Sequence, residues 1–146
     1  MNSLFEAEAY QEIKARIDKL TPEAANQWGK MNSAQMMHHC QFPLKTALKS
    51  EYQKPKVSLM ARFFKKSLYS DKAWRKNLPT PKRFKVLEEK DFNAEKQTLN
   101  ELIDAFYNRR DNQEWNPHPM FGHFTHEQWG KMQYKHLDHH LKSFGV

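Results

Sequence analysis

The chain has 146 residues, a length typical of one domain, and we expect residues 1–146 to fold as a single domain with its own core. Lys and Arg total 24 and Asp and Glu total 17, so the formal net charge is +7. The single cysteine excludes an internal disulfide framework, and only 4 glycines with few alternating apolar runs favour helices over sheets.

The N-terminal residues do not have the pattern of an export signal. Residues 1–8 are acidic and lack an apolar core run, and no segment of the chain approaches the length of a membrane span. The single cysteine, Cys40, fits a reducing compartment. We therefore expect a cytoplasmic protein with no membrane partner.

Basic residues are densest in residues 54–85. A solvated surface is the simplest interpretation, and we favour it over a nucleic-acid footprint because the remaining basic residues are spread along the chain. Nucleic acid is therefore not an expected partner. An anion-attracting rim around a pocket is a third interpretation of the same charges.

The first predicted helix spans residues 4–20. Ser3 and Glu6 have the spacing of a capping box, and apolar residues recur behind them at helical intervals. Thr21 and Pro22 then begin a short turn or helix, because proline is favoured at a first helical position, and Gly29 should end it.

The second long helix should begin after Asn32, which pairs with Gln35 as another capping box, and run to about residue 49. Pro43 lies inside this helix and should bend it, since proline removes one backbone donor.

Residues 54–88 are the least regular part of the chain. A short helix is predicted over residues 58–69, with its apolar positions turned inward, and these are Leu59, Phe63 and Leu68. Residues 77–81 contain two prolines and should be extended. We expect the whole segment to cover one end of the domain.

Two further helices complete the prediction. Asp91 opens a helix to about residue 108, and a rigid connector follows over residues 116–119. Thr125 and Gln128 form a capping box that opens the last helix, which should run to Phe144 before a terminating glycine. Four long amphipathic helices with one long crossover between the second and third predict an all-α four-helix bundle.

The last predicted helix carries two histidines, His136 and His140, at a spacing of four residues. This spacing places both imidazoles on one helix face, together with Trp129 and Met132. Buried imidazoles need partners, and a divalent cation binds them in their neutral form. The alternative is that each is a core histidine with a backbone or tyrosine partner, and the pair alone does not decide between the two.

A third ligand is available on the second helix, where His39 shares the inward face with Met36. His38 should point outward, and Cys40 is better explained as a small buried apolar residue than as a ligand. We therefore predict a metal site of His39, His136 and His140, which leaves an open position on Zn²⁺ or Ni²⁺ for water or substrate.

The remaining histidines and the tryptophans receive simpler interpretations. We expect His126 to be exposed and His118 to line the mouth of the bundle. The tryptophans should be core or rim aromatics, and these are Trp28, Trp74, Trp115 and Trp129.

Two motifs resemble those of a known superfamily. The segment Trp28-Gly-Lys-Met-Asn-Ser-Ala-Gln-Met-Met-His-His39 resembles the second-helix motif of the DinB/YfiT-like superfamily, and Tyr134-Lys-His136-Leu-Asp-His139-His140 resembles its fourth-helix motif. Pro117-His-Pro-Met-Phe-Gly122, followed by Glu127-Gln-Trp129-Gly, looks like a subfamily of unassigned function within that group.

The resemblance implies a four-helix bundle that binds a divalent metal through one histidine of the second helix and two of the fourth. Carried over by position, these are His39, His136 and His140. Characterised relatives include transferases and isomerases that use low-molecular-weight thiols, and dimers are common among them. A small-molecule substrate, with a thiol as the candidate, and a homodimer are thus the partners that it implies.

Two functions remain open at this point. The first is a metalloenzyme that activates a thiol or water, with thiol-dependent S-transfer favoured over hydrolysis by the resemblance. It lacks an obvious base, and Asp104 is a candidate only in principle. The second is a non-enzymatic stress-response or binding module on the same scaffold, because the fold alone does not assign a function.

Overall fold

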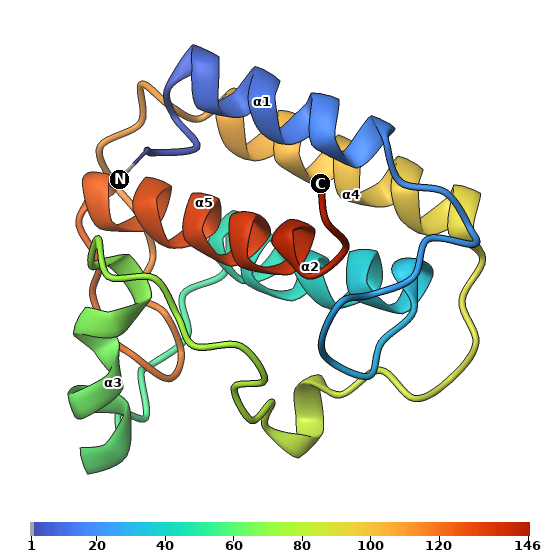
Figure 1. Ribbon diagram of the computed structural model, residues 1–146. Helices are drawn as coiled ribbons and strands as arrows, with labels where there is room; N and C mark the ends of the chain where they lie inside the picture. Colours follow the sequence, from blue (N-terminus) through green and yellow to red (C-terminus); the bar gives the residue numbers. More distant parts are fainter. Residues whose placement is uncertain (1) are drawn as a thin grey trace.

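The computed structural model describes residues 2–146, and it confirms the prediction of an all-helical chain. Across these residues there are five α-helices and one short 3₁₀ helix, and no strand (Figure 1). The helices are α1 (Ala7–Asp18), α2 (Ser33–Leu48), α3 (Leu59–Tyr69), η1 (Lys82–Phe84), α4 (Phe92–Tyr107) and α5 (His126–Lys142). No helix of this part combines the length and apolar character that crossing a lipid bilayer requires.

The four longest helices enclose the core. α1 packs against α4 and α5, α2 packs against the same two helices, and α3 lies outside this group against α5 (Figure 1). The fully buried side chains come from all four of the longest helices and include Ile13, Leu44, Leu99, Ile103, Phe106 and Leu137. Burial of one such side chain contributes about 1.5–3 kcal/mol, so this shared core is what holds α2 and α5 together.

Side-chain caps begin α2, α4 and α5 at the predicted residues. Asn32 with Gln35 and Thr125 with Gln128 both form complete capping boxes at the starts of α2 and α5. The Asp91 carboxylate likewise accepts a hydrogen bond from a backbone amide at the start of α4. These bonds are local in sequence, which is why a short pattern was enough to predict them.

The first helix begins later than predicted, at Ala7 instead of residue 4, and the turn after it does not become a helix. The Leu4 amide donates to the Gly130 carbonyl (N···O 3.0 Å), which draws the N-terminal residues onto α5. Gly130 permits this approach, because a Cβ there would collide with the side chains of Ser3 and Phe5. A tertiary contact therefore replaces the predicted first turn.

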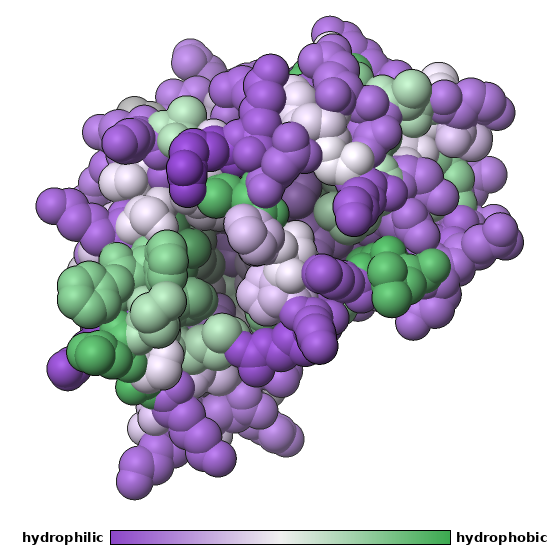
Figure 2. Space-filling model, turned by 60° about the horizontal axis from the view of Figure 1, so that its bottom comes forward, coloured by the Kyte–Doolittle hydropathy of each residue, from purple (hydrophilic) through white to green (hydrophobic). Residues whose placement is uncertain are grey.

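The inward face predicted for α3 is wrong for two of its three residues. Leu59 and Phe63 are 71% and 76% exposed, and only Leu68 is partly buried. The buried residue of α3 is instead Ala61, and the Lys65 ammonium lies over the ring of Phe124, which precedes α5 (4.9 Å to the centroid). Figure 2 shows the resulting apolar area at the α3 end of the molecule.

The crossover between α2 and α4 contains α3, the extended residues 77–81 and η1. Asn77 adopts a left-handed conformation (φ 58°), and its side-chain carbonyl accepts a hydrogen bond from the Gly29 amide (3.0 Å). The bond ties the crossover to the loop that precedes α2. The two loops together form one side of the pocket described below.

Candidate metal centre

Three histidines from two helices meet inside the protein. His39 lies on α2, and His136 and His140 lie one turn apart on α5. Their ring centroids form a nearly equilateral triangle with sides of 5.1, 4.6 and 4.7 Å. One nitrogen from each ring lies within 4.8 Å of the other two, so the group could hold a metal ion.

Two of the nitrogens have the separation expected of ligands to one ion. His39 Nε2 and His136 Nε2 are 3.2 Å apart. Two nitrogens at about 2.0–2.1 Å from a tetrahedral ion lie roughly 3.3 Å from each other. The backbones of α2 and α5 therefore hold this pair of rings at the correct distance for a shared ion.

A backbone carbonyl of the crossover orients His39. Its Nδ1 lies 3.0 Å from the Phe84 carbonyl oxygen, which can only accept a hydrogen bond. Nδ1 must therefore be the protonated nitrogen, and the lone pair of Nε2 faces His136. This outer hydrogen bond is the arrangement that metal-binding histidines use to set their tautomer and ring orientation.

Burial keeps the three rings neutral. It lowers the pKa of His39 below the ordinary value, and it lowers those of His136 and His140 much further. The neighbouring imidazoles lower the last two pKa values again by charge repulsion. Nδ1 of His136 is buried with no hydrogen-bond partner among residues 2–146. A buried polar atom without a partner lowers the stability of the folded state. Neutral imidazole is also the form that binds a metal ion.

Aromatic rings enclose the group. The Trp74 ring lies 6.2 Å from that of His136 and 5.4 Å from that of His139, and the Trp28 ring lies 6.3 Å from His139. Phe42 meets His39 edge-on at 6.1 Å. Trp28 and Trp74 are therefore rim aromatics of this site, whereas Trp115 and Trp129 are buried in the core.

Sequence analysis missed Lys135, whose ammonium lies 5.2 Å from the centre of the Trp74 ring. Only 4% of Lys135 is exposed, and its ammonium donates to the carbonyls of Ser67 (2.6 Å), Ser70 (2.8 Å) and Lys72 (2.7 Å). It therefore fastens the end of α3 and the start of the next loop to α5. No local pattern identifies a buried lysine of this kind, because its acceptors lie more than 60 residues away in the chain.

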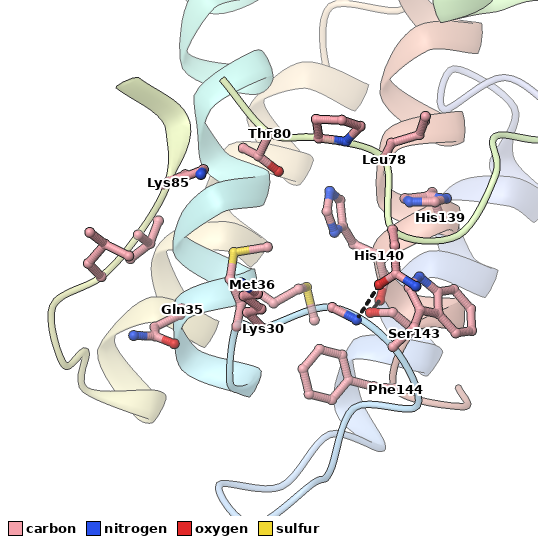
Figure 3. A pocket seen from close by; sticks show the side chains of 17 residues that line it. Lys30, Gln35, Met36, Leu78, Thr80, Lys85, His139, His140, Ser143 and Phe144 are labelled. Carbon is pink, nitrogen blue, oxygen red and sulfur yellow. Dashed lines mark hydrogen bonds between the residues drawn. The ribbon is translucent and has the colours of Figure 1, made fainter. Parts of the chain in front are cut away.

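A pocket of about 590 Å³ opens beside the histidines (Figure 3). His140 and His139 supply part of its wall, and Met36 of α2 and Phe144 supply an apolar surface. The loop before α2 and the crossover complete the lining, with Trp28, Lys30, Asn77, Leu78, Thr80, Lys85 and Val86 among the contributors. The volume is in the range of small-molecule sites, about 300–1,000 Å³.

Other side chains considered from the sequence lie elsewhere. His38, which we expected to point outward, is half-buried, and its Nδ1 lies 3.0 Å from the Glu95 carboxylate on α4. Cys40 is buried as expected, and burial raises the pKa of its thiol. Asp104 accepts hydrogen bonds from Tyr10 (2.7 Å) and Lys14 (2.6 Å) of α1 and does not line the pocket, which removes it as a base.

The histidines near the start of α5 are structural. His126 is not exposed as predicted, because it is half-buried and its ring stacks on Phe5 with centroids 4.1 Å apart. His118 packs on Trp129 (5.9 Å) and accepts a hydrogen bond from the Met120 amide (3.0 Å). Burial lowers the pKa of His118 to about 4, so it is neutral at pH 7. Neither ring joins the group of three.

Comparison with known proteins gave one match. The search of curated proteins and the search of solved structures gave none. A protein family described as a protein of unknown function, DUF1569, matches residues 2–145. Because this match covers nearly the whole chain, the protein belongs to the DUF1569 family.

Proposed function

We propose that this protein is a metal-dependent enzyme in which His39, His136 and His140 bind one divalent ion. The observation that carries the proposal is the 3.2 Å separation of two neutral, buried Nε2 atoms on different helices, with the third ring beside both. Three imidazoles suit Zn²⁺ or Ni²⁺ and leave a coordination position open. Catalytic sites keep such a position, whereas structural zinc sites are closed.

The bundle arrangement supports the same proposal. α1, α2, α4 and α5 correspond to the four helices expected from the DinB/YfiT resemblance, and the crossover lies between α2 and α4. That superfamily holds its ion with one histidine of the second helix and two of the fourth, the positions of His39, His136 and His140. A homodimer remains part of the proposal on the same ground.

The reaction we favour is S-transfer from a small thiol to an electrophile, with metal-dependent hydrolysis as the second choice. A divalent ion held by His39, His136 and His140 would supply a Lewis acid that lowers the pKa of a thiol or water. The thiol loses its proton to solvent, its sulfur forms the new bond to the electrophilic carbon, and the leaving group departs with its electron pair. Met36 and Phe144 give the pocket an apolar wall on the side of His140.

A non-enzymatic binding role is the alternative, and the surface of α3 is the observation that favours it. Four large apolar side chains of this helix are more than half exposed, and they are Leu59, Met60, Phe63 and Phe64. Contiguous exposed apolar side chains on a soluble domain often mark an interaction surface. In that case the bundle would serve as a scaffold for a protein partner.

Metal analysis of the purified protein tests the proposal. We expect about one Zn²⁺ or Ni²⁺ per chain after incubation with the metal salt and removal of excess ion. His39→Ala, His136→Ala and His140→Ala should each weaken metal binding by at least 10–100-fold, since even an outer partner of a metal ligand has effects of this size.

The matched control is His123→Ala, because His123 is exposed and lies outside the group. Circular dichroism establishes that each variant is folded. Folded variants that bind as much metal as the control would rule out the site. An assay of thiol transfer to model electrophiles, with and without metal, then separates the enzyme from the scaffold.

A further inference from the structure

Within residues 2–146, the pocket beside the three histidines is lined by positively charged side chains and by no negatively charged one. Among the described residues that line it, the charged side chains are Lys30 and Lys85, and none is Asp or Glu. The Lys76 ammonium adds a third positive charge at the rim, 4.6 Å from the centre of the Trp28 ring that lines the pocket. Lys76 and Lys85 of the basic segment thus add positive charge at this place, where no described lining residue carries a negative charge.

Neither of the two lining lysines is neutralised within the protein. Across residues 2–146, no carboxylate lies within ion-pair distance of Lys30 or Lys85, and no side-chain hydrogen bond occupies either ammonium. Other lysines of the chain do have carboxylate partners, such as Lys14 with Asp104 (2.6 Å) and Lys142 with Asp138 (2.7 Å). Two free ammonium groups beside a concave apolar wall attract anions.

The positions of the groups define the shape of a matching ligand. Figure 3 draws Lys85 and His139 at opposite sides of the view, with His140 between them and Phe144 below. The surface between these polar groups is mostly apolar and is formed by Trp28, Met31, Met36, Leu78, Val86 and Phe144. A ligand that reaches the histidines must cross this apolar surface.

We infer that the pocket binds a small organic anion. Its acidic group, a carboxylate, sulfonate or phosphate, lies against Lys30 and Lys85, and its short apolar body lies along Met36 and Phe144. Its other end reaches the candidate metal centre at His140, the member of the three histidines that lines the pocket. The inference rests on the proposed function for this last contact only, because the lysines and the apolar wall are independent of any ion. It names the substrate class of the site, a small acid.

A matched pair of thiols tests the inference in Co²⁺-loaded protein. The probes are 3-mercaptopropionate and 3-mercaptopropan-1-ol, which differ in the carboxylate only, and thiolate binding to Co²⁺ is followed by near-ultraviolet absorbance. We expect the carboxylate probe to bind about tenfold more tightly, the size expected for two partly exposed charge pairs. The preference should decline in high salt, because salt screens such pairs.

The K30Q/K85Q double variant should reduce the preference to within about twofold while it retains Co²⁺. The matched control is K19Q/K49Q, which removes two exposed lysines outside the pocket and has the same net charge. It should keep the full preference. Equal binding of the two thiols, or a preference that K30Q/K85Q leaves unchanged, would overturn the inference.

A second arm without metal separates this inference from the proposed function. Here 3-phenylpropionate and 3-phenylpropan-1-ol are titrated into metal-free protein, and binding is measured by calorimetry. A carboxylate preference that K30Q/K85Q abolishes supports the anion site even if the protein binds no Co²⁺, in which case only the metal proposal fails. If neither probe binds, or both bind equally, the anion site is refuted whatever the metal result.

Discussion

Helices α2 and α5 and the crossover between α2 and α4 contribute to the same site in different ways. The two helices supply the three histidines from a rigid core, and side-chain caps begin both of them. The crossover supplies the Phe84 carbonyl that orients His39, the Trp74 ring and much of the pocket lining. Helical periodicity therefore locates the candidate ligands, whereas the carbonyl that orients His39 and much of the pocket lining come from irregular segments.

A matched pair of leucine substitutions tests how differently the two regions contribute to stability. Leu44→Ala on α2 removes a fully buried side chain and should lower the free energy of unfolding by about 2–5 kcal/mol. Leu59→Ala on α3 removes a side chain that is 71% exposed and should change it by less than about 0.5 kcal/mol. Urea unfolding followed by circular dichroism measures both.

The small effect of Leu59→Ala applies to the isolated chain. If Leu59→Ala destabilises the protein by an amount that grows with protein concentration, α3 is covered in solution by a second copy or another partner. If both substitutions have the same small effect, the core described above is wrong.

Lys135 joins the two regions, so its removal should separate them. Lys135→Met keeps the length of the side chain but leaves the carbonyls of Ser67, Ser70 and Lys72 without their donor. We expect a loss of about 1.5–3 kcal/mol in the free energy of unfolding, the range for hydrogen bonds to a charged group. A change in tryptophan fluorescence should accompany it, because the Lys135 ammonium lies 5.2 Å from the centre of the Trp74 ring.

Lys131→Met is the control for this prediction. It removes a lysine of the same helix whose partner, Glu127, is exposed. Because solvent screens an exposed pair of this kind, its removal should change the free energy of unfolding far less than the removal of Lys135. Equal stability of the two variants would show that Lys135 does not fasten the crossover.

Acid should destabilise the metal-free protein through the histidine group. The folded state holds the pKa values of His136 and His140 well below those of the unfolded chain, so the unfolded state binds more protons as the pH falls below about 6.5. The free energy of unfolding should therefore fall by up to about 1.4 kcal/mol per pH unit for each proton, and it should be highest above pH 6.5. Denaturant unfolding between pH 5 and pH 8 measures the slope.

His140→Gln should make this slope shallower, because it removes one of the groups whose pKa is lowered. An identical slope for wild type and variant would mean that His140 is not held neutral by the fold. Bound metal should make the loss of stability with falling pH steeper, since protons then compete with the ion for the same nitrogens.

Sequence patterns predicted the helix starts and the histidine face of α5, but not the exposed side of α3. The starts of α2, α4 and α5 were predicted because Asn32, Asp91 and Thr125 bond to amides within the next three residues. The shared face of His136 and His140 followed from the helical period alone. The exposed side of α3 was not predicted, because the period identifies an apolar face but does not say what will cover it.

The amino-acid sequence by itself determined the helices, their caps and the histidines that each helix turns inward, because these depend on neighbours within one or two turns. Only the tertiary structure decided that His39 and His136, 97 positions apart, lie with their Nε2 atoms 3.2 Å from each other. It also decided that His38 pairs with Glu95 and that Lys135 fastens the crossover. Such contacts depend on how helices pack around a common core, and no local pattern records that packing.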